Sequence, residues 1–318
     1  MANFADQMVA KTREVGPLVV GFDPHFSLLP PFLLEKWLGR ERTLENLALC
    51  VRDFNGTLLE ALSGVVGFIK LQMAFYEALG IAGMMVLKET IDEAKRRGFL
   101  VILDGKRNDI ASSAEAYACG YLSGISMSKE WYFPSFWDVD ALTVNPYFGR
   151  DGLLPFAEEA QKKGKGIFIL ARTSNPSASF IQDEGEKEKV FVKVVHLAWE
   201  LGEGFLGTQG WGSVGVVVGA TYPEDVRLLR TMFPRLPFLL PGIGTQQGSL
   251  KAVTFGLGEG GLGVLVNVSR DILFAYRETE DREGYAFAEK AKEKALFYRE
   301  QLKECTEEWK RSFAESNG

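Results

Sequence analysis

Short apolar runs alternate with helix-like segments along almost the whole chain. Eight runs have the length of a β-strand and lead into a polar residue or a turn: PLVVGFDPH, VVGFIKLQ, LVILDGKR, DALTVNP, GIFILARTSNP, VGVVVGAT, LPFLLPGIG and GVLVNVSRD. A segment with helical spacing of its apolar residues precedes the first run, at 4–15, and others lie between the runs, at 43–62, 74–97, 110–127 and 186–206. This alternation predicts a parallel sheet of the α/β class, and eight strands close a (β/α)8 TIM barrel.

A doubly wound open sheet is the alternative to the barrel. That fold would carry a glycine-rich phosphate loop after an early strand, and no G-x-G-x-x-G follows the first apolar run. No domain boundary is visible, because the glycine cluster at 256–263 is best interpreted as the loop that enters the last strand. We therefore expect a single domain over 1–318, with a barrel core at about 15–276 and a C-terminal helical extension at 277–318. Within this extension, 281–313 is expected to form a long charged helix. Near the N-terminus, segment 24–42 is expected to form a loop or short lid.

Composition and charge narrow the class of protein. The 318 residues are 46% hydrophobic and 25% charged, which is ordinary for a globular protein. The net charge is −6 and no Lys/Arg stripe with interleaved aromatics occurs, so nucleic acid is not an expected partner. Three scattered cysteines without CxxC indicate a reducing compartment. With no signal-peptide pattern and no run of 18 apolar residues, we expect no membrane association and a cytoplasmic location.

The stretch LVILDGKRNDIASS, residues 100–113, is an apolar run that ends abruptly in charge. Burying charge is costly unless the charge is paired or functional. Alternation along a strand places Asp104 and Lys106 on one face, where both can meet one small molecule. The plainer interpretation is a strand-end ion pair that ties down a loop. Chemistry in a barrel sits at the C-terminal ends of strands. The predicted ends carry Asp23, Lys70, Asp104, Lys106, Asn145, Ser174 and Arg270.

The last two strand ends, PGIGTQQG and NVSRD, suggest a phosphate site. In barrels the loops after strands seven and eight commonly bind phosphate through backbone N–H groups. Gly242 and Gly244 would let the backbone approach an anion closely, and Arg270 could grip two phosphate oxygens with its planar guanidinium. A phosphorylated ligand is therefore expected, although such features taken singly are often an ordinary turn or ion pair.

The sequence offers little for metal or covalent catalysis. It contains no HxH, HExxH or acidic cluster suited to a divalent ion, and no GxSxG elbow. His196 lies in an amphipathic helix, and His25 follows the first strand end, where it could bond a loop. We expect no metal site, which leaves the lysines and aspartates at the strand ends to carry the chemistry.

Lysines packed beside aspartates can support three kinds of chemistry. A neutral lysine could form a Schiff base, a charged lysine could protonate a carbanion, and a carboxylate could face an anionic group that leaves the substrate. Two like charges about 4 Å apart repel by about 4 kcal/mol at an effective dielectric of 20, which is useful only if the reaction removes one, as loss of CO2 does. Flanking aspartates keep lysine charged and so disfavour the Schiff base.

These residues resemble a known family. DGKRNDI resembles the motif of orotidine 5′-phosphate decarboxylases, and LDGKRNDIASSAEAYA is similar to a branch found in many bacteria. Further similar segments follow in the family's order over about residues 15–276: GFDPH, FIKLQMAFYEALG, TVNPYFGRDGLLPF, ARTSNPSA, VVVGATYPED, LPFLLPGIGTQQG and NVSRDI. The resemblance implies conversion of orotidine 5′-phosphate to uridine 5′-phosphate and CO2, the last step of de novo pyrimidine nucleotide synthesis, without a cofactor.

The resemblance also implies a catalytic array. Lys70, Asp104 and Lys106 would be three of its members, and Asp109 would be the fourth, reaching into the active site of a neighbouring subunit. A homodimer is implied in this way, with Ser113 near the shared boundary. Asp104 would face the substrate carboxylate, and Lys106 would protonate C6 once CO2 has departed.

The remaining implied residues bind the rest of the nucleotide. Asp23 would hold a ribose hydroxyl, Ser174 the pyrimidine, Gln246 both the pyrimidine and the phosphate, and Arg270 the phosphate. Asp271 stands where the family has a small residue, and an anion there would weaken phosphate binding unless its side chain turns outward.

Two other functions remain open from the sequence. One is another reaction of the same barrel superfamily on a sugar phosphate, which would usually require a Mg2+ ligand set. The other is a non-catalytic nucleotide-binding protein, in which a costly charged array would have no purpose.

Overall fold

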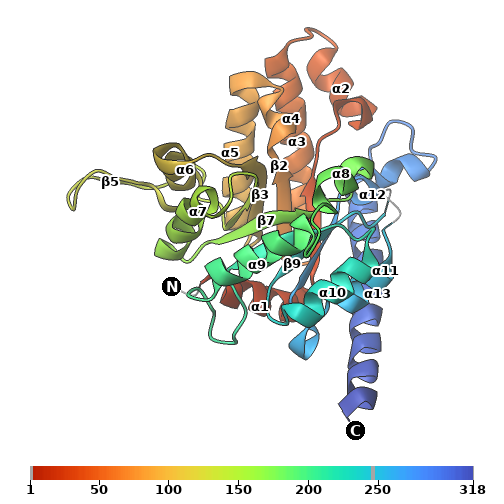
Figure 1. Ribbon diagram of the computed structural model, residues 1–318. Helices are drawn as coiled ribbons and strands as arrows, with labels where there is room; N and C mark the ends of the chain where they lie inside the picture. Colours follow the sequence, from red (N-terminus) through yellow and green to blue (C-terminus); the bar gives the residue numbers. More distant parts are fainter. Residues whose placement is uncertain (1–2, 245–247, 318) are drawn as a thin grey trace.

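The centre of the molecule is a closed barrel of eight parallel strands (Figure 1). The computed structural model describes residues 3–244 and 248–317. The barrel runs in the order β1-β10-β9-β8-β7-β6-β3-β2. Its strands are β1 (Leu18–Phe22), β2 (Phe68–Gln72), β3 (Leu100–Arg107), β6 (Ala141–Val144), β7 (Gly166–Arg172), β8 (Val214–Val218), β9 (Phe238–Pro241) and β10 (Val264–Val268). This order confirms the predicted (β/α)8 barrel and excludes the open sheet.

Helices cover the outside of the barrel because each carries one apolar face toward the strands. The main ones are α3 (Leu44–Leu62), α5 (Gly80–Arg96), α6 (Ala111–Ala118), α7 (Arg150–Lys162), α9 (Val190–Gly202), α10 (Pro223–Met232), α11 (Leu250–Gly256) and α13 (Phe287–Asn317). α13 is the expected long C-terminal helix, and it packs against α3 and α11 before it extends past the barrel (Figure 1).

The N-terminal end of the barrel is closed by α1 (Phe4–Val15). The helix inserts its apolar face into the cluster that fills the barrel interior, where the Phe4 ring meets Phe168 edge-on at 5.9 Å between ring centroids. A side chain at Gly166 would collide with Phe4, so the start of β7 needs glycine there. Because this end is plugged, the opposite end of the barrel is the one that can admit a ligand.

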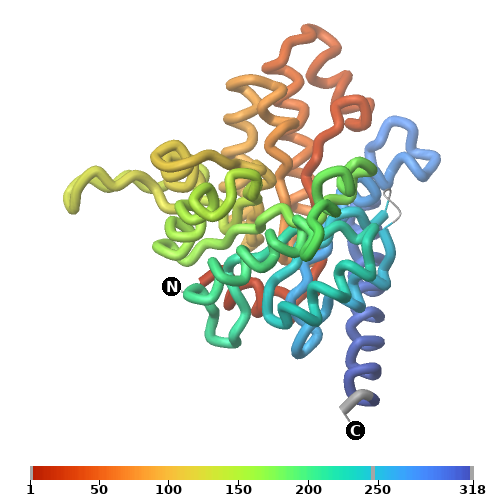
Figure 2. The backbone as a smooth tube through the Cα atoms, viewed as in Figure 1, coloured from red at the N-terminus to blue at the C-terminus, as the bar shows by residue number. Residues whose placement is uncertain are grey.

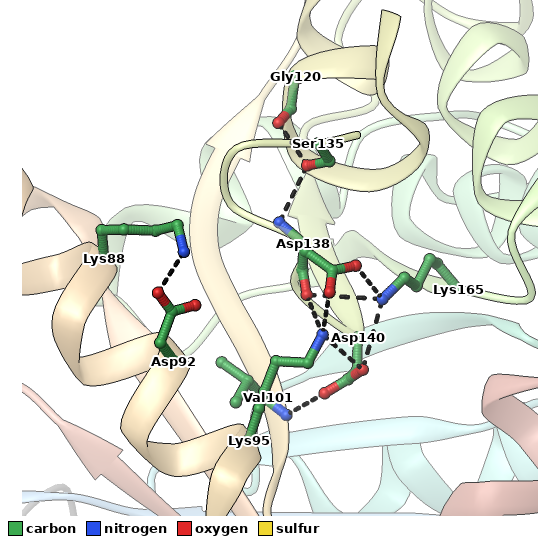
Figure 3. Close-up of polar contacts among 9 residues, drawn as sticks. All are labelled: Lys88, Asp92, Lys95, Val101, Gly120, Ser135, Asp138, Asp140 and Lys165. Atoms are coloured by element: carbon green, nitrogen blue, oxygen red, sulfur yellow. Dashed lines mark hydrogen bonds and ion pairs between the residues drawn. The ribbon is translucent and has the colours of Figure 1, made fainter. Parts of the chain in front are cut away.

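A group of charged side chains lies at the N-terminal ends of β3, β6 and β7 (Figure 3). Asp140 accepts a hydrogen bond from the backbone N–H of Val101 at 2.8 Å. The ammonium groups of Lys95 and Lys165 both reach Asp138, at 2.5 and 2.8 Å. These contacts join α5 to the starts of β3, β6 and β7. Residues at this end of a barrel usually contribute to stability rather than to catalysis.

Short elements fill the connections. They are α2 (Pro31–Leu38), α4 (Met73–Glu77), α8 (Ser179–Gln182), α12 (Arg270–Leu273), and the hairpin of β4 (Ile125–Ser126) and β5 (Tyr132–Phe133). Figure 2 shows this hairpin projecting away from the body. Segment 24–42, expected to be a loop or short lid, contains a 3-10 turn at Phe26–Leu28 and α2.

Four predicted helices had wrong boundaries, and one of them, expected at 186–206, spans only Val190–Gly202. The helix expected at 110–127 ends at Ala118 and continues as a π-helical turn to Ser123, before Gly124 at φ 87° redirects the chain into β4. The helix expected at 74–97 is interrupted before Gly80, whose φ is 62°. The helix expected at 281–313 begins only at Phe287, because Asp281 accepts backbone N–H bonds that hold a turn.

None of the helices in residues 3–244 and 248–317 has the length and apolar character needed to cross a membrane.

Candidate active site

A cavity of about 430 Å³ opens at the C-terminal ends of the barrel strands. Its charged lining side chains come from four strand ends and are Asp23, Lys70, Asp104, Lys106 and Arg270. A larger groove of about 910 Å³ lies outside the barrel between α2, α3 and α5. Its cations pair with its own carboxylates, Lys36 with Asp53 and both Arg96 and Arg97 with Glu93. The barrel cavity is the stronger candidate, because its charged side chains converge at the C-terminal ends of the strands, where barrel enzymes carry their active sites.

Asp104 is the centre of the charged group. Its Oδ2 accepts hydrogen bonds from Lys70 Nζ at 2.9 Å and Gln72 Nε2 at 3.0 Å. Its Oδ1 accepts from Lys106 Nζ at 2.7 Å and Thr143 Oγ1 at 2.8 Å. Burial alone would raise the pKa of Asp104, but Lys70 and Lys106 outweigh it and hold the pKa well below its usual range. The carboxylate is thus charged at neutral pH and held in one orientation.

The two lysines have different surroundings. Lys70 is buried between Asp104 and Asp23, with its Nζ 3.7 Å from Asp23 Oδ1. Burial alone would lower the pKa of Lys70, but the two carboxylates outweigh it and raise the pKa above its ordinary value. The Lys70 side chain is 6% exposed, whereas that of Lys106 is 45% exposed. Lys106 is therefore the ammonium group that a ligand in the cavity can reach.

The backbone at Lys106 departs from a regular strand. Its φ is +46°, a left-handed conformation that is unfavourable for residues with a side chain. The pairing of β3 with β6 shifts between Leu103 and Arg107, so β3 carries a bulge there. Asp104 and Lys106 line the same cavity through this bulge rather than through simple alternation.

The expected phosphate end of the cavity is formed by β9 and β10. Gly242 and Ile243 line it beside Arg270, and Gly242 and Gly244 have φ values of 104° and 91° that favour glycine. Gln246 lies outside the described residues. The side chain of Asp271 turns toward the C-terminal helix, where its Oδ2 accepts a hydrogen bond from Tyr298 of α13 at 2.8 Å.

Ser174 lines the cavity from the loop that follows β7. Two neighbouring residues anchor this loop. Arg172 contacts Asp183 at 3.1 Å, and the backbone N–H of Thr173 donates to Gln182 Oε1 at 2.9 Å. These contacts join the strand end to α8 and so place Ser174 at the cavity wall.

Three residues named from the sequence lie elsewhere. Asp109 is not among the lining residues, and its Oδ1 accepts from the N–H of Ile110 at 2.8 Å. Ser113 is exposed on α6. Asn145 directly follows β6, which ends at Val144, so its predicted place at a strand end is confirmed. Its side chain accepts from the N–H of Tyr147 and does not line the cavity.

Sequence reasoning missed several polar lining residues, among them Gln72, Thr143 and Asn267. Gln72 lies two residues after Lys70 on the same strand, so alternation could have placed it on the same face. Thr143 could have been found only from the pairing of β3 with β6, which is not local in sequence.

In the parts of the chain that the structure describes, no group of three or more His, Cys, Asp or Glu side chains is arranged to hold a metal ion.

Such a cavity at the C-terminal face of a (β/α)8 barrel is typical of barrel enzymes that act on small anionic molecules. The chain belongs to the orotidine 5′-phosphate decarboxylase / HUMPS family, whose model matches residues 41–285. This membership confirms the resemblance drawn from the motifs, and it makes the protein an enzyme.

Individual relatives agree with the family match. An orotidine 5′-phosphate decarboxylase of Rhodopirellula baltica is 41% identical over 282 residues, covering 88% of this chain and 91% of the relative. One of Caldicellulosiruptor bescii is 34% identical over 280 residues, covering 87% and 91%. Among solved structures, the OMP decarboxylase of Leishmania donovani superposes with a TM-score of 0.67 at 29% identity, over 93% of this chain and 99% of that one.

Proposed function

We propose that the protein converts orotidine 5′-phosphate to uridine 5′-phosphate and CO2, the reaction for which its relatives are named. The observation that carries the proposal is a continuous series of ion pairs on the cavity wall. It runs from Asp23 to Lys70, from Lys70 to Asp104 and from Asp104 to Lys106. A charged carboxylate with an accessible ammonium group beside it suits a reaction that expels a carboxylate and then needs a proton.

Asp104 opposes the substrate carboxylate in this mechanism. Like charges about 4 Å apart repel by about 4 kcal/mol at an effective dielectric of 20, and departure of neutral CO2 removes this repulsion. Asp104 cannot relieve it by taking up a proton, because Lys70 and Lys106 hold its pKa low. The interaction therefore destabilises the bound substrate more than the transition state.

Lys106 is the proton donor in this proposal. When the bond from C6 to the carboxyl carbon breaks, its electron pair stays on C6, and the Lys106 ammonium donates a proton to form C6–H. The lysine regains a proton from water. The electron pair of the broken bond ends in the new C–H bond, so the proposed reaction uses no redox partner and no cofactor. Lys70 is less suited to this role because it is buried between two carboxylates.

The remaining cavity residues would hold the nucleotide. Asp23 is proposed to bind a ribose hydroxyl and Ser174 the pyrimidine, as the family motifs imply, because both line the cavity. Arg270 and the backbone at Gly242 and Gly244 would bind the phosphate. Gln246 is proposed, from the family motif, to bridge pyrimidine and phosphate.

We also propose that the enzyme is a cytoplasmic homodimer. Asp109 lies outside the cavity of its own chain, which suits a residue that completes the site of a second copy together with Ser113 near the boundary. Its three cysteines are unpaired, as is usual in a reducing compartment.

The test is the ultraviolet absorbance of orotidine 5′-phosphate mixed with purified protein in EDTA. We expect rapid loss of the orotate band with the native protein and a fall of at least about a thousandfold with Lys106→Ala. Lys310→Ala, which removes an exposed lysine of α13, serves as the control and should retain native activity. A folded native protein that leaves the band unchanged would refute the proposal and redirect attention to sugar phosphates with Mg2+ present.

A further inference from the structure

Thr143 occupies a special position opposite the bulge of β3. β3 and β6 pair at Leu103 with Leu142 and again at Arg107 with Val144. Between these two pairs β3 has the residues 104–106, whereas β6 has only Thr143. Thr143 is therefore the β6 residue that faces the segment carrying the carboxylate and the ammonium group of the proposed reaction.

The hydroxyl of Thr143 makes two hydrogen bonds to that segment. It accepts from the backbone N–H of Lys106 at 3.0 Å and donates to Asp104 Oδ1 at 2.8 Å. The directions are unambiguous, because a backbone N–H can only donate and an ionised carboxylate can only accept. One hydroxyl thus joins the backbone of the lysine to the side chain of the aspartate.

We propose that Thr143 is a positioning residue for the decarboxylation proposed above, on which this inference rests. Its hydroxyl holds the Asp104 carboxylate and the Lys106 backbone in a fixed relation, so that repulsion and proton donation act on the same bound substrate. It acts through those two residues, and it is distinct from the catalytic groups.

Two features of the bulge give this hydroxyl its importance. Lys106 is held at φ +46°, and such a conformation persists only where surrounding contacts hold it. Thr143 supplies one of those contacts. In addition, Oδ1 of Asp104 has Thr143 and the long, half-exposed Lys106 side chain as its donors. Without the hydroxyl, only a flexible side chain would restrain that oxygen.

The chemistry of threonine allows packing and positioning to be separated. Thr143 is 1% exposed, so its shape matters for packing as well. Valine keeps the branched shape but removes the hydroxyl, whereas serine keeps the hydroxyl but removes the methyl group. A packing role predicts that serine is the more harmful substitution, and a positioning role predicts that valine is.

The experiment measures kcat and KM for orotidine 5′-phosphate with Thr143→Val and Thr143→Ser. We expect the valine variant to lose about 10- to 100-fold in kcat, with KM changed less than about threefold, since the array is misplaced while the nucleotide still binds. The serine variant should keep kcat within about threefold of native.

Thr90→Val on α5 is the matched control. Thr90 is also buried, and its hydroxyl likewise accepts one hydrogen bond, from Asn55, and donates one, to the carbonyl of Val86. It lies outside the cavity lining, so its valine variant should lose stability but retain native kcat. Thermal unfolding of all three variants shows how far each loss of activity follows a loss of fold.

Each outcome bears on the inference. The inference is overturned if Thr143→Val keeps native kcat, or if Thr143→Ser loses more kcat than Thr143→Val. It is also overturned if Thr143→Val changes only KM. If Thr143→Val does not fold, the serine variant still decides, because a loss of kcat in a folded Thr143→Ser protein contradicts a hydroxyl role. An inactive native protein would refute the proposed function itself, which is a distinguishable result.

Discussion

Each oxygen of Asp104 accepts two hydrogen bonds, and this pattern decides how the carboxylate behaves with pH. The pKa of Asp104 is lower in the folded protein than in the unfolded chain, where it is about 3.9. Its contribution to stability is therefore present above that unfolded value and is lost as the pH falls toward the folded one. Near neutral pH the site keeps its charge, as the proposed mechanism requires.

Arg230 shows a different way to bury a charge. It is 7% exposed and stacks on the Phe238 ring at 4.0 Å, and burial lowers its pKa to about 9. In place of a carboxylate it has backbone carbonyl partners, those of Phe233, Pro234, Leu236, Gly256 and Gly263. These bonds tie α10 and α11 to the loops that enter β9 and β10.

We predict that Arg230→Met lowers the free energy of unfolding by about 3 kcal/mol or more, because several buried carbonyls lose their donor. Urea denaturation measures the change. Arg227→Met on the same helix is the control, since Arg227 is 62% exposed and should change stability by less than about 0.5 kcal/mol. Equal effects of the two substitutions would show that the carbonyl contacts contribute little.

At the scale of elements, the strands were predictable and the junctions between them were not. Apolar runs and polar strand ends are local features, so the sequence correctly placed the strand of Lys70 and the strand of Asp104 and Lys106. The bulge at Lys106 and its contact with Thr143 depend on which strand lies beside β3. That neighbour is set by barrel closure, which no local pattern contains.

The phosphate end shows the same limit. Asp271 looked unfavourable beside Arg270, and only the fold reveals that its carboxylate binds Tyr298 on α13. A side chain at Gly244 would place its Cβ 2.5 Å from Asp271 Oδ2, so this carboxylate packs directly behind the loop. The C-terminal helix therefore supports the turn that we propose to bind phosphate.

We predict that Tyr298→Phe raises KM for orotidine 5′-phosphate about three- to tenfold and leaves kcat nearly unchanged, because the loop loses one support while the catalytic array is intact. Calorimetry provides the discriminating measurement. Binding of uridine 5′-phosphate should weaken, whereas binding of uridine, which lacks the phosphate, should not. If binding of uridine weakens as much as binding of uridine 5′-phosphate, the effect of Tyr298→Phe lies outside the phosphate loop.

At the scale of the whole molecule, the barrel gathers residues far apart in sequence and leaves Asp109 outside. Its loop lies on a surface with exposed apolar side chains, at Ile110, Tyr117, Tyr147 and Phe148. The loops of Asp109 and Phe148 meet there, since both flank Gly152. An apolar surface beside a carboxylate with no place in its own site is what a shared dimer interface would need.

Mixing two inactive variants tests this arrangement. Lys106→Ala and Asp109→Ala should each be nearly inactive alone. If each site combines Lys106 of one chain with Asp109 of the partner subunit, a mixed dimer contains one doubly altered site and one native site. Random exchange after mild dissociation should then restore about a quarter of native activity, because half of the dimers are mixed and half of their sites are intact.

Lys106→Ala mixed with Asp104→Asn is the matched control for this experiment. Both changes lie in the array contributed by a single chain, so each site of the mixed dimer keeps one defect and activity should stay low. Recovery in the first mixture alone would establish that Asp109 acts across the interface. Full activity of Asp109→Ala by itself, or no recovery despite exchange shown by mass measurement, would mean that each chain works with its own residues.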